Sequence, residues 1–168
     1  FSDATYSAMR ERSVGLGVMG LHSFFQQKNI PLESVMSKVW NKKIFANIQT
    51  KADQASKLLA EERGSCPDAA EYGFNERFSN KTAIAPTASI SIICGGTSPG
   101  VEPFAANSYT HKTLSGSFNV RNRYLEDILE DHGKNDDETW SGITTNQGSV
   151  AHLDFLTDIE KDVFKTAF

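Results

Sequence analysis

Several features are scarce or missing in this sequence, and each absence excludes a class of protein. No apolar run approaches the roughly 18 residues of a membrane span, and no basic segment leads into an apolar one at the N-terminus. Cys66 and Cys94 lie far apart and outside any CxxC or Cys/His ligand spacing. The histidines are too scattered for a metal site, at positions His22, His111, His132 and His152. We therefore expect a cytoplasmic protein without metal ligands, whose two thiols are free and buried or half-buried.

An excess of positive charge is also missing. The formal net charge is -4, so duplex nucleic acid and anionic membranes are poor candidate partners. A small anionic ligand remains possible, because backbone dipoles bind anions on acidic proteins as well. With 168 residues, 39% of them hydrophobic, the chain is long enough to bury one core.

Helical patterns dominate the first half of the chain. Apolar residues recur at helical spacing between Ala8 and Gln27, and we predict a helix there despite its glycines. A longer helix is predicted after Pro31, and Gly64 is its stop signal. Its apolar face consists of Met36, Trp40, Ile44, Ile48, Ala52, Ala55 and Leu59. Asp68 to Lys81 is polar and mixed, which indicates a loop or a short helix.

The second half mixes strands and helices. Thr82 to Ala85 predicts a short buried strand, and Leu114 to Val120 alternates weakly and predicts another. A helix is predicted from Tyr124 to about Gly133, followed by a solvated acidic loop from Lys134 to Gly142. Helices with at least one short buried strand predict a helix-rich α/β fold.

The two ends of the sequence suggest a piece of a larger domain. The chain starts at Phe1 without a methionine. Near the other end, Thr157 and Glu160 have the spacing of a capping box, and the helix that they open has few residues left before Phe168. We therefore expect residues 1–168 to form a single partial domain, truncated at both ends.

One glycine motif admits two interpretations. Gly15, Gly17 and Gly20 match GxGxxG, with Glu33 as an acid at a suitable distance. A dinucleotide site would also need a strand before Gly15, and the preceding residues have no strand pattern. The alternative is that the glycines let this segment approach a neighbouring helix closely.

The stretch Pro86-Thr87-Ala88-Ser89-Ile90-Ser91 has the composition of a helix N-terminus. The first backbone amides of a helix lack partners, and small side chains leave them accessible to an anion. Thr87 and Ser89 could add hydroxyl donors. Ordinary helix capping is the alternative, and the residues alone leave both open.

Three blocks of the sequence resemble one known family. Residues 83–91, continuing to Gly100-Val101-Glu102-Pro103, resemble the substrate-phosphate segment of ribonucleotide reductase large subunits. Arg12 to Leu21 resembles the family's glycine-bearing helix, and Lys112 to Phe118 resembles the segment after the phosphate loop. The blocks occur in the family's order and are most similar to the class I form, with class II as the alternative. The resemblance implies a segment of the family's ten-stranded α/β barrel.

The resemblance also implies a division of labour. It assigns substrate-phosphate binding to Pro86, Thr87, Ala88, Ser89 and Ile90, chiefly through backbone amides. The radical cysteine, the reducing cysteine pair and the accompanying Asn and Glu of the family have no match here, so no catalytic residue is expected in this chain. We therefore expect a fragment of a ribonucleoside-diphosphate reductase, an oxidoreductase that makes deoxyribonucleotides for DNA synthesis, which is inactive by itself.

The implied partners are a ribonucleoside diphosphate, the remainder of the large subunit and a radical-generating small subunit, with no membrane and no direct nucleic-acid contact. No cofactor is expected in this chain, because the family uses a metal-dependent radical in the small subunit and a thioredoxin- or glutaredoxin-type reductant. The alternative function is a non-catalytic binding or assembly module derived from the same fold.

Overall fold

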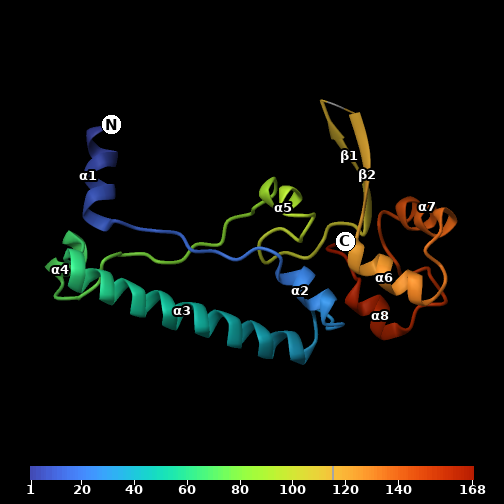
Figure 1. Cartoon of the computed structure of the whole chain (residues 1–168), viewed down its shortest axis with the longest axis horizontal. Helices are drawn as coiled ribbons and strands as arrows, with labels where there is room; N and C mark the ends of the chain where they lie inside the picture. The colour runs from blue at the N-terminus through green and yellow to red at the C-terminus, as the bar shows by residue number, and fades with distance from the viewer. Residues whose placement is uncertain (115) are drawn as a thin grey trace. The chain divides into compact units, whose positions relative to one another are not determined.

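The computed structural model describes residues 1–114 and 116–168, in two compact units (Figure 1). The first consists of Phe1–Val18 and Val39–Ala85, and the second of Met19–Lys38 and Pro86–Phe168. Ser115, which belongs to the third block of the family resemblance, lies outside the described residues. No described helix is long and apolar enough to cross a membrane.

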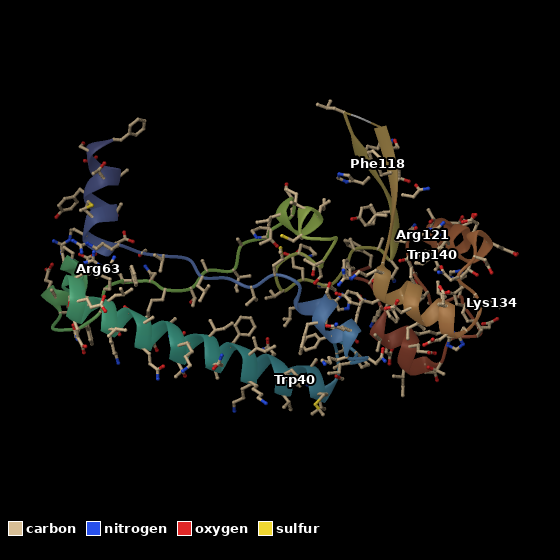
Figure 2. All side chains as sticks on the ribbon, viewed as in Figure 1. Trp40, Arg63, Phe118, Arg121, Lys134 and Trp140 are labelled. Carbon is tan, nitrogen blue, oxygen red and sulfur yellow. The ribbon has the colours of Figure 1, made fainter. Side chains whose placement is uncertain are left out.

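The long helix of the first unit confirms the prediction for the residues after Pro31. Helix α3 spans Val35–Arg63, and its first four residues belong to the second unit. Gly64, at φ 80°, follows its last residue, as expected of a left-handed C-terminal stop. Trp40, Ile44 and Ile48 are half-buried along one side of the helix, and Figure 2 labels Trp40 and Arg63.

Two shorter helices complete the first unit. Helix α1 spans Ser2–Glu11 and α4 spans Pro67–Glu71. Arg10 joins them, because its guanidinium pairs with Asp68 at 2.5 Å and with Glu71. The predicted loop or short helix from Asp68 to Lys81 is confirmed, since its first residues belong to α4 and residues 72–81 form a loop.

The predicted helix from Ala8 to Gln27 is wrong. Helix α1 ends at Glu11, Arg12 is left-handed at φ 50°, and α2 begins only at Leu21. Between them the chain is extended, and Leu16 forms a parallel bridge with Thr82. The segment that resembles a glycine-bearing helix is therefore an extended strand-like segment.

Glycine is needed where the extended segment lies closest to Ala83. A Cβ on Gly17 would lie 2.4 Å from the carbonyl oxygen of Ala83, closer than any real side chain approaches. Close approach is therefore the role of this glycine, as predicted, but its neighbour is another extended segment and not a helix.

The predicted buried strand at Thr82–Ala85 is extended but not buried. It pairs with residues 14–16, and the amide of Ala83 donates to the carbonyl of Leu16 at 3.1 Å. All four residues are exposed, with Ile84 at 50%. The apolar run thus predicted the backbone conformation correctly and the burial wrongly.

The second unit contains a hairpin and several helices. Strand β1 (Ser108–Thr113) pairs antiparallel with β2 (Gly116–Arg121), from Ser108 opposite Arg121 to Thr113 opposite Gly116. The predicted strand at 114–120 is confirmed as β2 with a shift of its ends. The helices of this unit are α2 (Leu21–Gln27), α5 (Ile90–Ile93), α6 (Arg123–Asp131), α7 (Asp137–Thr145) and α8 (Asp158–Val163).

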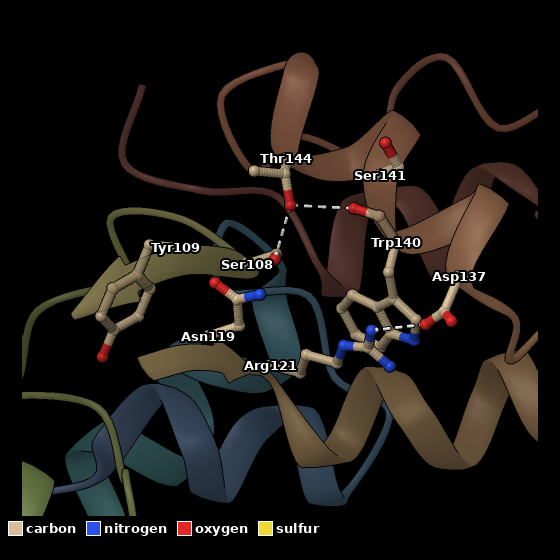
Figure 3. A pocket seen from close by; sticks show the side chains of 8 residues that line it. All are labelled: Ser108, Tyr109, Asn119, Arg121, Asp137, Trp140, Ser141 and Thr144. Carbon is tan, nitrogen blue, oxygen red and sulfur yellow. Dashed lines mark hydrogen bonds and ion pairs between the residues drawn. The ribbon is translucent and has the colours of Figure 1, made fainter. Parts of the chain in front are cut away.

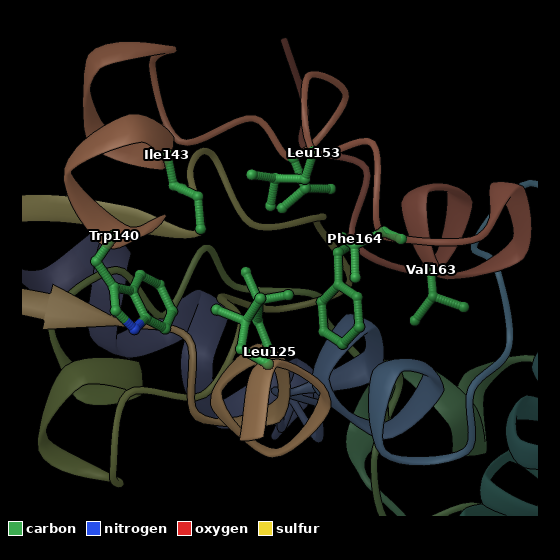
Figure 4. Close-up of a cluster of buried hydrophobic side chains, with 9 residues drawn as sticks. Leu125, Trp140, Ile143, Leu153, Val163 and Phe164 are labelled. Atoms are coloured by element: carbon green, nitrogen blue, oxygen red, sulfur yellow. The ribbon is translucent and has the colours of Figure 1, made fainter. Parts of the chain in front are cut away.

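Helices α6, α7 and α8 surround a core of buried apolar side chains (Figure 4). Its members are Leu125, Leu129, Trp140, Ile143, Val150, Leu153, Leu156, Val163 and Phe164. Burying a side chain of this size stabilises the folded state by roughly 1.5–3 kcal/mol. The prediction of α6 is confirmed, including its end before Gly133, which has φ 64°.

The predicted loop from Lys134 to Gly142 is wrong, since α7 begins inside it. Asp136 is the N-cap of this helix and accepts a hydrogen bond from the Thr139 amide at 2.8 Å. Asp137 and Glu138 occupy the first turn, where the helix dipole favours negative charge. The acidic cluster is thus a helix start rather than solvated surface alone.

The capping box at Thr157 and Glu160 is confirmed, with both reciprocal hydrogen bonds present. The helix that it opens does not run to the chain end as expected. Helix α8 ends at Val163, and both Val163 and Phe164 pack into the core.

Candidate functional site

The stretch from Pro86 to Ile93 folds as a tight turn into the short helix α5. Thr87 is left-handed at φ 53°, an uncommon conformation for a β-branched residue, whereas Ser89 is right-handed helical. The Thr87 carbonyl accepts from the Ser91 amide at 2.9 Å, and the Ser91 hydroxyl donates to the Ala88 carbonyl at 3.1 Å. Left-handed and right-handed residues close together can aim neighbouring amides toward one side, which is the geometry of an anion-binding nest.

Three amides of this turn are candidates for binding a ligand. Within residues 1–114 and 116–168, no backbone acceptor is found for the amides of Ala88, Ser89 and Ile90. Ser89 is the N-cap of α5 but makes no side-chain capping bond, and all three residues are exposed. The Ser89 side chain therefore does not act as an ordinary helix cap.

The Thr87 hydroxyl is supported from a second segment. Its Oγ1 accepts a hydrogen bond from the Gly100 amide at 2.7 Å, which leaves its own proton available for a ligand. The sequence did not single out the support given by Gly100. The glycine-rich turn before it was the one available signal.

A cavity of about 220 Å³ lies beside the turn, within the second unit. Pro86 and Ala88 line it, together with Ser91, Phe104 and Tyr109. Of the other predicted site residues, Thr87 is half-buried, and Ser89 and Ile90 are exposed at the start of α5. Among the described lining residues Glu102 is the one charged side chain, so an anion here would be bound by amides and hydroxyls.

A second depression of about 250 Å³ lies between the hairpin and α7 (Figure 3). Arg121 lies over the Trp140 ring, 5.1 Å from its centre, and pairs with Asp137 at 2.9 Å. Ser108 and Thr144 hydrogen-bond to each other at 2.8 Å. Because these groups satisfy one another, the depression is better explained as packing between the hairpin and α7 than as a ligand site.

The other candidate groups do not gather into a site. Cys66 is buried, as expected of a structural thiol, but Cys94 is exposed, so the expectation of two buried or half-buried thiols is wrong for Cys94. In the part of the chain that the structure describes, no group of His, Cys, Asp and Glu could hold a metal ion. Gly15 and Gly17 lie within the extended segment itself, with Leu16 between them bridged to Thr82, and Glu33 lies just before α3 and pairs with Lys165, so these residues do not form the strand-to-helix turn and second strand of a dinucleotide site.

Comparison with known proteins agrees with this geometry. The family model described as the barrel domain of ribonucleotide reductase matches residues 1–77 and 68–168. The chain belongs to this family. The resemblance noted in the sequence is therefore confirmed, as is the expectation of a helix-rich fragment of an α/β barrel.

Two relatives named ribonucleoside-diphosphate reductase large subunit show how much of such a protein this barrel-domain chain represents. It is 50% identical to that of Invertebrate iridescent virus 6 over 99% of this chain and 18% of the relative. It is 45% identical to that of Invertebrate iridescent virus 3 over 97% of this chain and 26% of the relative.

A solved structure supports the same assignment. The alpha subunit of the class Id ribonucleotide reductase of Actinobacillus ureae matches with a TM-score of 0.84 and 40% identity, over 96% of this chain and 29% of that subunit. The chain thus spans less than a third of the length of the relatives and the structure compared.

Proposed function

We propose that this chain is part of a ribonucleoside-diphosphate reductase large subunit and supplies the loop that binds the substrate's phosphates. The proposal rests on the amides of Ala88, Ser89 and Ile90, which have no backbone acceptor among residues 1–114 and 116–168, beside the hydroxyl of Thr87. A diphosphate has the negative charge and the many acceptor oxygens that such a nest binds. Pro86 fixes the backbone where the turn begins.

The role of the loop would be to position the substrate. A diphosphate bound here holds the ribose in one place, against a radical cysteine that the rest of the large subunit would supply. The complete enzyme would convert ribonucleotides to deoxyribonucleotides in the cytoplasm. It would use a radical from a metal-containing small subunit and a thioredoxin- or glutaredoxin-type reductant.

A charge placed in the nest tests this proposal. In a large subunit that contains this segment, Ser89→Asp puts a carboxylate beside the amides and should weaken ribonucleoside diphosphate binding about tenfold or more by repulsion. Ser141→Asp, an exposed serine on α7, is the matched control and should leave the affinity unchanged. Equal affinities of the Ser89→Asp variant and the parent would contradict the proposal.

The alternative function is a non-catalytic binding or assembly module, and experiments on the same complete large subunit distinguish it from the reductase. If the complete protein binds the diphosphate but shows no reduction with an active small subunit and reductant, the module explains the chain. Turnover that is lost with Ser89→Asp and kept with Ser141→Asp would exclude it.

A further inference from the structure

The start of helix α2 is capped by a residue that lies 75 positions further along the chain. The N-cap of α2 is Gly20, which has no side chain to offer. The Ser98 hydroxyl accepts from the Ser23 amide at 3.1 Å, the bond that an N-cap serine would normally make with the third helical residue. The Ser98 carbonyl also accepts from the Gly20 amide at 2.9 Å.

The contact is reciprocal and buried. The Ser23 hydroxyl accepts from the Ser98 amide at 2.8 Å, so the two serines exchange backbone-to-side-chain hydrogen bonds. Ser98 is 0% and Ser23 is 2% exposed. Hydrogen bonds shielded from water in this way are costly to lose, because the partner group stays buried without a partner.

Gly20 allows the segment around Ser98 to lie close to the start of α2. Its φ of 82° is a left-handed conformation, and a Cβ there would lie 2.5 Å from Oγ1 of Thr97. The last glycine of the GxGxxG motif therefore serves the contact between α2 and the segment 97–100.

The same segment holds the phosphate loop. Two residues after Ser98, the Gly100 amide donates to the Thr87 hydroxyl at 2.7 Å. One residue before Ser98, the Thr97 amide donates to the Ser91 carbonyl at 3.2 Å. Segment 97–100 is thus fixed to α2 on one side and to both ends of the Thr87–Ser91 turn on the other.

We propose that Ser98 and Ser23 are positioning residues for the phosphate loop: they fix Gly100, and through it the left-handed Thr87, without touching the substrate. This inference rests on the proposed function. A β-branched residue at positive φ needs support from its surroundings, and the Gly100 hydrogen bond is the support that the structure provides.

The test uses a complete large subunit with its small subunit and reductant. Ser98→Ala should raise the KM for a ribonucleoside diphosphate about fivefold with kcat little changed, because ground state and transition state lose the same phosphate contacts. The inhibition constant of inorganic pyrophosphate should rise by the same factor. Ser98→Thr keeps the hydroxyl and should restore both values.

Two further variants keep the test decisive. Ser23→Ala leaves the α2 cap intact and removes only the bond to the Ser98 amide, so it reports on the loop even if Ser98→Ala folds poorly. Ser108→Ala removes another buried serine of the same unit, at 7% exposure, and should leave KM and the pyrophosphate constant unchanged.

The outcomes separate this inference from the proposed function. Unchanged constants in Ser98→Ala and Ser23→Ala, with weakened binding in Ser89→Asp, would overturn the positioning role and leave the phosphate loop in place. Unchanged constants in all three would remove both. A KM increase in Ser108→Ala equal to that in Ser98→Ala would also overturn the positioning role, since any buried serine would then have the same effect.

Discussion

Two regions differ in how far their apolar side chains are buried. One is the α6–α8 cluster, which is the apolar core between these helices, and the other is the pair of extended segments at residues 13–18 and 80–85. Leu125 in the cluster is 0% exposed, and its neighbours come from all three helices. In the extended pair, Leu16 and Ile84 are 53% and 50% exposed. The cluster is therefore held by a core of its own, and the extended pair by backbone hydrogen bonds.

This difference in burial explains where the apolar pattern of the sequence predicts the structure correctly. An apolar period predicts both structure and burial when the partners of that face lie in the same described chain, as in α6. For residues 82–85 the apolar run predicts the extended backbone correctly but not the exposure, since Ile84 is 50% exposed. Each region thus needs a different kind of test.

The largest effect is expected in the cluster. Leu125→Ala removes a fully buried side chain and should lower the free energy of unfolding by about 2–5 kcal/mol, from lost transfer energy and the cavity that remains. Urea unfolding followed by Trp140 fluorescence in a Trp40→Phe background measures it.

Leu16→Ala is the matched control for this change. The same atoms are removed from a half-exposed side chain, so we expect a loss below about 1 kcal/mol in the first unit. Comparable losses at Leu125 and Leu16 would contradict the contrast between the two regions.

The sequence predicted the helices better than the turns. Helix α3 and helix α6 follow from their apolar periods and from the glycines that end them. The break between α1 and α2 could not be predicted, because the fit of Gly17 against Ala83 depends on a segment 66 residues away in sequence. Helix α7 differs from the prediction because Asp136 is its N-cap, a role that the acidic run from Asp136 to Glu138 does not distinguish from surface charge.

For the candidate site, the composition of the stretch from Pro86 to Ile90 predicts accessible amides, and its geometry does not follow from the sequence. The amides of Ala88, Ser89 and Ile90 have no backbone acceptor among the residues described. The left-handed Thr87 could not be anticipated, because threonine rarely adopts it and its support comes from Gly100. Long-range hydrogen bonds of this kind leave no local pattern.

An intermediate effect on the stability of the second unit is expected at low pH, and it comes from His22. Burial lowers the pKa of His22 from its ordinary value of 6.5 to about 4, while the Val163 carbonyl acts in the opposite direction. The Nδ1 atom accepts from the Phe104 amide at 3.0 Å, so the neutral ring is the form that fits. The unfolded chain binds this proton more readily, and stability is therefore lost as the pH falls from about 6.5 to about 4. The complete loss is about 3 kcal/mol, at roughly 1.4 kcal/mol per pKa unit.

Unfolding free energies measured between pH 7 and pH 4.5 isolate this histidine from the carboxylates. Asp136, for example, has a pKa lowered by the Thr139 amide, and its contribution is lost only below its ordinary value of 3.8. His22→Asn keeps a hydrogen-bond acceptor and does not titrate, so its stability should vary less with pH in this window. His152→Asn, an exposed position, should retain the slope of the parent chain. A steep slope that persists in His22→Asn would assign the effect to another group.

A smaller effect than in the cluster is expected from the fit of Gly17 in the extended pair. Gly17→Ala places a Cβ 2.4 Å from the Ala83 carbonyl oxygen, so the two segments must separate, at a cost of about 1–3 kcal/mol. The amides of Leu16 and Ala83 donate across the pair, and their hydrogen exchange should become about tenfold faster or more. Gly15→Ala is the control, because its Cβ meets only the Ala83 side chain, at 3.1 Å, and exchange should change much less. If exchange were equally fast in both variants and in the parent, the pair would already open freely in the parent. The difference in order between the pair and the cluster would then be larger than their side-chain exposures alone indicate.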